Sequence, residues 1–345
     1  MKAIAYEGTG RLRTMSVDAA PPGPGELQIA VAYCGLCGTD LHIAHGDMDA
    51  RVSTPLVFGH EASGTVAAVG SEVEGWAPGD PLTVMPLVWD GTCAACLAGH
   101  QHICQNLTFV GIDAPGALQQ LWNVPASIAV PLPAGLDLRT AALVEPVAVA
   151  VHDVRRSELQ IGDRVVVLGG GPIGVLIACV ARHAGADVLV AEIDESRRGL
   201  IAALGIDVLD PAAADRGAEV ERRTGGTGAD VVFEVSGAAA AARSATALAK
   251  VRGTIVVVAI HSAAREIDLQ RVFWRELRLL GARVYQRSDF ERAIQLLHQG
   301  VIPGAELISG VVALEDTATA VKDLSAGRGM KILVDVAGAP AEATA

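Results

Sequence analysis

The chain has 345 residues, of which 51% are hydrophobic and 19% are charged, so it is a globular rather than a disordered protein. Its length exceeds the size at which one hydrophobic core usually stops growing, and two domains are therefore expected. Lys and Arg number 27 against 39 Asp and Glu; the resulting net charge of -12 would repel a phosphate backbone, which argues against nucleic acid as a partner.

Residues 1–7 contain neither an apolar stretch nor a cleavage signal, so a cytoplasmic location is expected. The long uncharged run 165–181 is short for a membrane span and is broken by several glycines and Pro172, which indicates strand, turn and helix. No membrane partner is therefore expected. In a reducing compartment the six cysteines would serve as metal ligands or free thiols rather than disulfides.

Residues 1 to about 150 contain short β segments, such as 27–32 and 62–69, separated by Gly and Pro. Regular turns between short strands predict a small β-rich domain.

Inside this part, residues 37–42 (Cys-Gly-Thr-Asp-Leu-His) place a thiol, a hydroxyl, a carboxylate and an imidazole within six residues. Residues His60 and Glu61 add a second imidazole and a second carboxylate. Catalytic zinc is usually held by three protein ligands and keeps a fourth position open. Cys37, His60 and one of Glu61 or Glu145 would satisfy that count.

The remaining polar residues of this stretch suit supporting roles. Asp40 would orient the ligating imidazole through its other ring nitrogen. Thr39 and His42 are then the groups available for proton transfer.

Residues 90–104 form a different kind of segment. Asp90, Cys93, Cys96 and Cys104 follow one another at spacings of three, three and eight residues, and the three cysteines indicate a second zinc site with Asp90 as a candidate fourth ligand. His100 and His102 are alternatives to Asp90 as the fourth ligand. The competing interpretation is a degenerate lobe with three idle thiols.

Residues 141–152 are apolar enough for a helix between the two domains, and Pro146 suits its first turn. Glu145 would then lie near the helix start, either as a capping carboxylate or as a metal ligand.

From Asp163 onward strands and helices alternate, which predicts a doubly wound parallel α/β sheet. A buried strand at 165–168 is followed by Gly169-Gly170-Gly171-Pro172-Ile173-Gly174 and an apolar helix. Gly169 allows the tight turn, Gly171 admits a pyrophosphate, and Gly174 lets the helix pack on the strand. Pro172, Ile173 and Gly174 form the start of this helix, and the backbone N–H groups of a helix start bind phosphates. Pro172 itself has no N–H to donate.

The next strand, 187–191, ends at Glu192. A carboxylate about 20 residues after the glycines accepts hydrogen bonds from the ribose hydroxyls and repels a 2′-phosphate, which favours NAD over NADP. Asp194 is a rival for this role. Arg197 and Arg198 could instead serve a 2′-phosphate.

Strands are expected within 228–237 and 253–260, and a helix begins near Asp289. A last strand is expected at 331–336, followed by an Ala-rich tail after Gly338 that would fray. The predicted domains are residues 1–150, residues 151–286, and a return to the first domain over 287–345.

Residues 37–42 together with Gly59-His60-Glu61 resemble the zinc-dependent medium-chain dehydrogenases, and the resemblance runs nearly end to end. Because Glu145-Pro146 stands where other members have a cysteine, the chain is most similar to the polyol, butanediol and threonine dehydrogenase branch. The resemblance implies a GroES-like catalytic domain, a Rossmann domain, and a role for Glu145 at the zinc. It also implies homodimers or homotetramers that pair cofactor-domain strands, for which the expected strand 279–285 is a candidate.

These observations predict a zinc- and NAD-dependent oxidation of a secondary alcohol, or reduction of its ketone. Zinc makes a bound alcohol more acidic, Thr39 takes its proton, and the proton passes by the cofactor ribose to His42. One alternative is a metal-free enone or quinone reductase of the same fold. Another is a non-catalytic NAD(H)-binding sensor with purely structural zinc.

Overall fold

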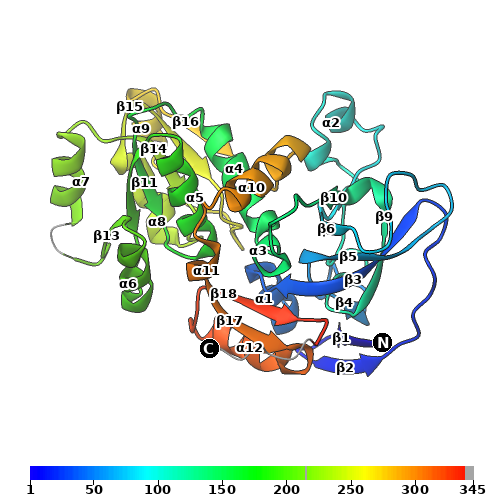
Figure 1. The fold of residues 1–345 in the computed structure, drawn as a ribbon. Helices are drawn as coiled ribbons and strands as arrows, with labels where there is room; N and C mark the ends of the chain where they lie inside the picture. The colour runs from blue at the N-terminus through cyan, green and yellow to red at the C-terminus, as the bar shows by residue number, and fades with distance from the viewer. Residues whose placement is uncertain (214–215, 339–345) are drawn as a thin grey trace. The chain divides into compact units, whose positions relative to one another are not determined.

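The computed structural model describes residues 1–213 and 216–338; the Ala-rich tail after Gly338 lies outside the described residues. The chain folds into two compact units (Figure 1). The first unit comprises 1–145, 293–300 and 304 onward, and the second comprises 146–292 and 301–303. The division thus falls at 145/146, where the sequence suggests 150/151, and at 292/293, where it suggests 286/287.

The first unit is built on a mixed sheet with the order β10-β6-β5-β3-β18-β17, in which β9 also pairs with β3. Its pairs are antiparallel except for β17 and β18, which pair in parallel. β3 (Glu26–Gly35) alternates buried and partly exposed residues, as expected for a strand with one face on the core. β18 (Lys331–Asp335) pairs antiparallel with the end of β3, so the last part of the chain returns to this sheet.

The other strands of this unit are β1 Lys2–Tyr6, β2 Leu12–Ser16, β4 Leu56–Val57, β5 Glu61–Val69, β6 Pro81–Val84, β7 Leu87–Val88, β8 Thr108–Phe109, β9 Leu121–Pro125, β10 Ala129–Pro131 and β17 Ile308–Ala313. Its helices are α1 Gly38–His45, α2 Ala94–Leu97, α3 Leu138–Ala141, α11 Gly304–Leu307 and α12 Thr317–Ser325. The short 3-10 helices are η1 Gln101–Ile103, η2 Ala126–Ile128 and η3 Leu314–Asp316.

The second unit contains a six-stranded sheet with the order β13-β12-β11-β14-β15-β16, and every pair of neighbours is parallel. Its strands are β11 Arg164–Leu168, β12 Asp187–Ala191, β13 Asp207–Leu209, β14 Ala229–Glu234, β15 Ala249–Val257 and β16 Arg278–Gly281. Its helices are α5 Pro172–His183, α6 Glu195–Ala203, α7 Arg216–Thr224, α8 Ala239–Leu248 and α9 Leu269–Trp274, together with most of α4 Val144–Ser157 and the first half of α10 Arg287–His298. This order confirms the predicted doubly wound sheet.

Helices cover both faces of this sheet. Val166 and Leu168 of β11 belong to a buried cluster that includes Ala245 of α8 and Ile255 of β15. Val167 points the other way, since a Cβ added at Gly174 in α5 would lie 3.5 Å from its side chain. The helices α5 and α8 therefore pack on opposite faces.

The expected strand 279–285 is wrong in its second half. β16 ends at Gly281, and Val284 has a φ of 50°, a left-handed conformation that interrupts extended backbone. Tyr285 is fully buried, so its apolar character reflects packing in the core. The helix expected at 141–152 begins at Val144 and continues to Ser157.

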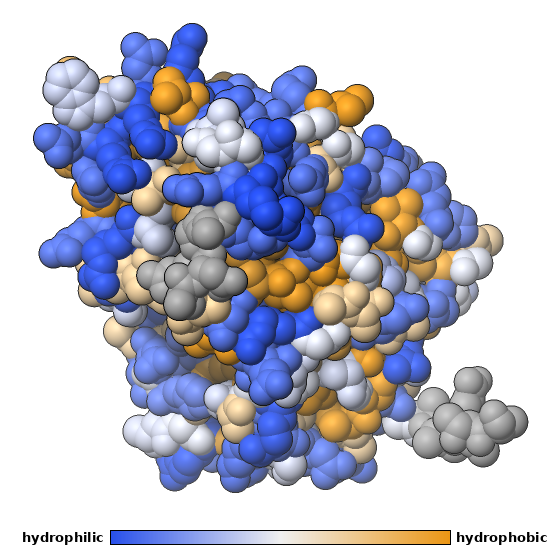
Figure 2. All heavy atoms as spheres, turned by 90° about the vertical axis from the view of Figure 1, so that its left-hand side faces the viewer, coloured by the Kyte–Doolittle hydropathy of each residue, from blue (hydrophilic) through white to orange (hydrophobic). Residues whose placement is uncertain are grey.

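Hydrophilic side chains dominate the face drawn in Figure 2, and apolar side chains gather in smaller groups between them. Among the described residues, no helix combines the length and apolar character needed to cross a bilayer.

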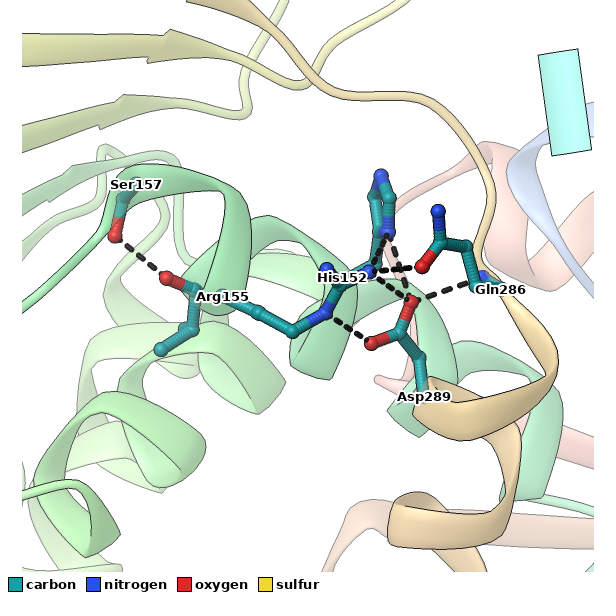
Figure 3. Close-up of polar contacts among 6 residues, drawn as sticks. His152, Arg155, Ser157, Gln286 and Asp289 are labelled. Carbon is teal, nitrogen blue, oxygen red and sulfur yellow. Dashed lines mark hydrogen bonds and ion pairs between the residues drawn. The ribbon is translucent and has the colours of Figure 1, made fainter. Parts of the chain in front are cut away.

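A buried carboxylate joins α4 to the start of α10 inside the second unit (Figure 3). Asp289, which is 1% exposed, accepts hydrogen bonds from Arg155 Nε at 2.6 Å and Nη2 at 2.9 Å. Its Oδ2 also lies 2.9 Å from His152 Nδ1 and accepts from the backbone N–H of Gln286. Burial raises the pKa of Asp289, but the hydrogen bonds from His152 and Arg155 outweigh it and hold the pKa well below the usual range.

Asp153, one residue beyond His152 in α4, is in the opposite situation. It is 0% exposed, and neither carboxylate oxygen has a hydrogen-bond partner among the residues that the structure describes. Burial and the neighbouring charge of Asp289 raise its pKa well above the ordinary value.

The contributions of Asp289 and Asp153 to the free energy of unfolding should depend on pH in opposite directions. Asp289→Asn should lower the free energy of unfolding at pH 7 by about 2–4 kcal/mol, because it removes a hydrogen-bonded buried charge from its partners. The folded pKa of Asp289 is depressed, so its stabilisation is present above the unfolded pKa of about 3.9 and is lost as the pH falls below it. Urea unfolding at several pH values measures both effects.

Asp153→Ala is the matched variant. The pKa of Asp153 is raised in the folded protein. Its contribution to the free energy of unfolding is therefore most favourable below pH about 3.9 and becomes less favourable as the pH rises. Relative to the wild type, Asp153→Ala should therefore gain stability with rising pH. A loss that grows with pH would contradict this account.

Candidate metal centres and cofactor-binding turn

Three potential metal ligands meet in the first unit. Cys37 precedes α1, and His60 and Glu61 stand at the start of β5. The thiol, imidazole and carboxylate atoms lie within 4.8 Å of one another. Gly59 allows this approach: its φ is 94°, and a Cβ there would meet Cys34 Sγ at 2.8 Å.

Asp40 supports this group from behind. Its Oδ2 accepts a hydrogen bond of 2.9 Å from the backbone N–H of Cys37, and its Oδ1 lies 3.6 Å from Nδ1 of His60. Both residues are buried, at 0% and 2% exposure. Because Nδ1 faces Asp40, the other ring nitrogen of His60 is the one available to a metal ion.

The electrostatics of this group favour a cation. Burial lowers the pKa of His60, but the charges of Asp40, Cys37 and Glu145, with a hydrogen bond to Cys37, raise it to about 10. A site that stabilises an imidazolium so strongly carries excess negative potential. The donor set of thiolate, imidazole and carboxylate is the one that zinc prefers, so these residues fit the metal.

Lys331 is the functional neighbour that sequence reasoning missed. Its Nζ lies 2.7 Å from each oxygen of Glu61 and donates to the carbonyl of Leu36 at 3.0 Å, with 3% of the residue exposed. Burial lowers the pKa of Lys331, but the charge of Glu61 raises it above the usual value. The available signal was a lysine opening the otherwise apolar strand β18, since a lysine is rarely buried without a partner.

Three other predicted residues lie around this centre but outside the group of three. Thr39 Oγ1 is 3.9 Å from the sulfur of Cys37. His42, one turn later on α1, is exposed and lies 2.9 Å from Asp47 Oδ2. Glu145 is 5% exposed and acts on the pKa values of both His60 and Lys331.

Asp90, Cys93, Cys96 and Cys104 form a second group, whose ligand atoms also lie within 4.8 Å of one another. His100 and His102 are not part of it; their rings contact each other with centroids 6.2 Å apart. The geometry therefore favours Asp90 over either histidine as the fourth donor.

Backbone N–H groups prepare this second group for negative charge. Gln105 N donates to Cys93 Sγ at 3.4 Å, and Asn106 N donates to Cys104 Sγ at 3.3 Å. The hydrogen bond from Gln105 is the main reason that the pKa of Cys93 is lowered. Burial raises the pKa of Cys96 to about 12, so its thiol needs a nearby cation to ionise.

The glycine-rich turn joins β11 to α5 in the second unit. Gly169 has a φ of 112°, and a Cβ at Gly174 would lie 1.9 Å from the carbonyl oxygen of Gly169. Around Gly171, by contrast, a Cβ would meet nothing within 4 Å. The turn thus needs glycine at both ends for its own packing, while Gly171 and the N–H groups that follow Pro172 leave open space for a ligand.

Glu192 lies directly beside this turn. It is 5% exposed, and its oxygens accept hydrogen bonds from the backbone N–H groups of Gly170 at 2.7 Å and Asp194 at 2.8 Å. The side chain of Asp194 caps α6 by accepting from Arg197 N at 2.8 Å, so it is committed to the helix. Arg198 donates to the carbonyls of Glu192 and Ile193, whereas Arg197 Nε is buried without a partner in the described structure.

Residues in both units match family models of dehydrogenases. Residues 23–134 match the family model of the alcohol dehydrogenase GroES-like domain, and residues 172–299 match that of the zinc-binding dehydrogenases. The chain is 50% identical, over 97% of its length and 98% of the relative, to 2-dehydro-3-deoxy-L-galactonate 5-dehydrogenase of Pseudoalteromonas atlantica. It is 34% identical to L-threonine 3-dehydrogenase of Rhizobium johnstonii, over 93% of this chain and 94% of the relative.

Solved structures agree. A protein described as a zinc-binding dehydrogenase from Sinorhizobium meliloti, bound to NADP, has a TM-score of 0.91 and 34% identity, over 97% of this chain and 98% of that chain. The 2R,3R-butanediol dehydrogenase of Bacillus subtilis has a TM-score of 0.89 and 30% identity, over 97% of this chain and 99% of that chain. The chain therefore belongs to the zinc-dependent medium-chain dehydrogenase/reductase family, as the residues 37–42 and 59–61 indicated.

Proposed function

We propose that this enzyme oxidises a secondary alcohol group on a polyhydroxylated carbon chain with NAD, or reduces the corresponding ketone. The observation that carries the proposal is the buried group of Cys37, His60 and Glu61, with Asp40 behind the imidazole. The relative with 50% identity is named for dehydrogenation at carbon 5 of a deoxy sugar acid, and others are named for threonine or D-xylulose. These names favour hydroxylated carbon chains over simple alcohols.

Cys37, His60 and Glu61 would hold the catalytic zinc. Bound zinc would acidify the alcohol, and bound nicotinamide would exchange a hydride with its carbon. Glu61 is preferred to Glu145 as the third ligand because its carboxylate belongs to the group within 4.8 Å. Lys331 balances part of the negative charge that Glu61 brings, and Glu145 stays close as the alternative donor.

Thr39 and His42 would move the alcohol proton. The Thr39 hydroxyl lies beside the Cys37 sulfur, and His42 follows at the i+3 position of α1, where side chains share a face. Because His42 is exposed and pairs with Asp47, it can exchange protons with water.

The two alternatives fit the chain less well. A metal-free reductase of the same fold has no need for a half-buried thiol within 4.8 Å of a buried imidazole and a buried carboxylate. A non-catalytic sensor predicts a fully coordinated metal, whereas this group offers three protein donors and leaves a fourth position for substrate.

A second, structural zinc is proposed at Asp90, Cys93, Cys96 and Cys104. The support is the gathered set of four donors and the N–H groups that point at the sulfurs. Since this lobe is mostly exposed and contains only short helices, metal binding would supply much of its order.

NAD is the proposed cofactor, bound by Gly169, Gly171, Pro172, Ile173, Gly174 and Glu192. The carboxylate of Glu192 lies against the glycine-rich turn, where a 2′-phosphate would be repelled. Arg197 is the residue that could soften this preference, and the Sinorhizobium relative was solved with NADP.

Self-association through β16 is also proposed. This strand lies at the edge of the sheet, and the preceding helix α9 exposes Leu269, Phe273 and Trp274 at 70–73%. Unpaired strand edges and large exposed apolar groups favour a second copy of the chain. A homodimer or homotetramer in the cytoplasm fits this surface and the six free cysteines.

The catalytic assignment predicts that Cys37→Ser loses activity by at least about 1,000-fold, because the metal loses a ligand. NAD binding should stay within about threefold, since the glycine-rich turn belongs to the other unit. NADH formation is measured with 3-deoxy sugar acids, sugar alcohols, 2,3-butanediol and threonine; Cys179→Ser, at a partly buried thiol of α5, is the matched control. Ordinary turnover by Cys37→Ser would rule out the zinc mechanism.

The structural site predicts about two zinc ions per chain in metal analysis. The double variant Asp90→Ala, Cys93→Ser should retain one and lose thermal stability while it still binds NAD. A wild-type protein with one zinc and three titratable thiols in residues 90–104 would show that this lobe holds no metal.

The cofactor assignment predicts that the wild type prefers NAD and that Glu192→Ala narrows this preference by at least about tenfold in kcat/KM. The variant loses both the ribose hydrogen bonds and the charge repulsion. Asp194→Ala, which removes a nearby carboxylate that caps α6, should lower stability instead of changing the preference. Equal wild-type kcat/KM for NAD and NADP would disprove the role given to Glu192.

The assembly proposal predicts a dimer or larger species in light scattering at micromolar protein. Leu279→Arg combined with Trp274→Glu should shift it toward the monomer, because the new charges would be buried at the edge of β16. A monomeric wild type would refute the proposal.

A further inference from the structure

A hollow of about 240 Å³ lies inside the second unit, on the face of the sheet that α8 covers. Its walls come from α8, from Ile255 and Val257 of β15, and from the segment 261–267 after β15. Glu234, at the end of β14, reaches the same wall. The hollow therefore lies on the opposite face of the sheet from α5.

Four buried polar atoms at this hollow have no hydrogen-bond partner in the described part of the chain: Thr246 Oγ1, Glu234 Oε2, His261 Nδ1 and Arg265 Nε. Thr246 and Glu234 are each 1% exposed. Buried polar groups without partners are uncommon, because their lost hydration is not replaced. Glu234 Oε2 still has an ion-pair contact, 3.0 Å from His261 Nε2, so the case for a ligand rests on the other three atoms. Three such atoms at one hollow indicate a ligand that supplies the missing bonds.

The hydroxyl of Thr246 is the clearest of the four. A helical threonine usually bonds to the carbonyl one turn earlier, as Thr224 of α7 does to Val220 at 2.8 Å. Thr246 makes no such bond, although the backbone around it is helical. Its hydroxyl is therefore free to donate to a group inside the hollow.

Charge decides what kind of group this is. Glu234 is already compensated: its Oε1 accepts from Ser236 N, Ser236 Oγ and Gly237 N, and its Oε2 lies 3.0 Å from His261 Nε2. Within residues 1–213 and 216–338, the contact found for Arg265 is a long one, 3.5 Å from Nη2 to Ser262 Oγ. The surplus charge at the hollow is thus the guanidinium, which pairs best with a carboxylate.

The rest of the wall is aliphatic, from Ala242, Ala245, Ile255 and Leu279 among others. A cavity of about 150 Å³ admits benzene, so this one suits a molecule of about eight non-hydrogen atoms. We propose that the hollow binds a compact aliphatic monocarboxylate, with its carboxylate at Arg265 and Thr246 and its carbon chain against α8 and β15.

The test uses 4-methylpentanoate with the full-length protein and is read without turnover, by saturation-transfer NMR and titration calorimetry. The acid should bind with a Kd of about 1 mM or tighter, as expected for a ligand of this size. The matched 4-methylpentan-1-ol and 4-methylpentylammonium should bind at least about tenfold more weakly, because they cannot pair with a guanidinium.

Two conservative variants place the ligand. Arg265→Gln should weaken binding of the acid by at least about tenfold, and Thr246→Val, which keeps the side-chain shape, by about threefold or more. Arg271→Gln removes the same charge from α9 outside the hollow and should leave binding unchanged. Thermal unfolding shows that each variant is folded.

Three results would overturn the proposal. The first is no binding of the acid at all, and the second is binding of the alcohol as tight as that of the acid, which would mean an apolar hollow without anion recognition. The third is an affinity for the acid that is the same in the wild type, Arg265→Gln and Thr246→Val.

Discussion

Buried negative charge around His60 is the constraint on which the first unit depends. Asp40 and Glu61 are both 0% exposed. The sulfur of Cys37 lies within 4.8 Å of ligand atoms of His60 and Glu61, and Asp40 faces Nδ1 of the same histidine. Removing carboxylates from water is costly unless cations are close, and Lys331 supplies only one. A bound divalent metal would balance the remaining negative charge. The side chains of this group lie at the ends of β3, β5 and β18, where the pairing of Gly35 with Glu61 and Leu333 fixes the register of the strands and so the positions of the ligands.

The second unit meets a different requirement, which is to keep space open beside the first turn of α5. Gly174 can approach Gly169 only because it lacks a Cβ, and this contact seats the first turn of α5 on β11. Glu192 then closes the turn by binding Gly170 N. The open space beside Gly171 is thus held by neighbours that are tightly packed, and this packing would keep the proposed cofactor site rigid although it is built from glycines.

Most of this could be predicted from the sequence, because the signals were local. The strand at 187–191 and the helix after Gly171 follow from hydrophobic period and turn chemistry within a few residues. Residue type and spacing also predicted that Cys37 and His60 lie together and that Asp90 lies with three cysteines, and the structure brings the ligand atoms of each group within 4.8 Å. What escaped depends on contacts across the chain: Lys331 lies 270 positions from Glu61, and Asp289 lies 137 from His152. The strand predicted over 279–285 is too long because its apolar residues were all attributed to strand pairing. Tyr285 is instead buried in the core, beyond the end of β16.

The same distinction separates the two kinds of buried polar group in the second unit. Asp289 is buried and fully paired, so it has a structural explanation within α4 and α10. In the described part of the chain, Thr246 Oγ1 and Arg265 Nε are buried without hydrogen-bond partners. Each could have found a partner at little cost, by a bond to the preceding helical turn or by exposure to water. A chain that leaves such groups unpaired at an apolar hollow bears a cost in stability that packing does not repay, and a bound ligand is the physical account that satisfies them together.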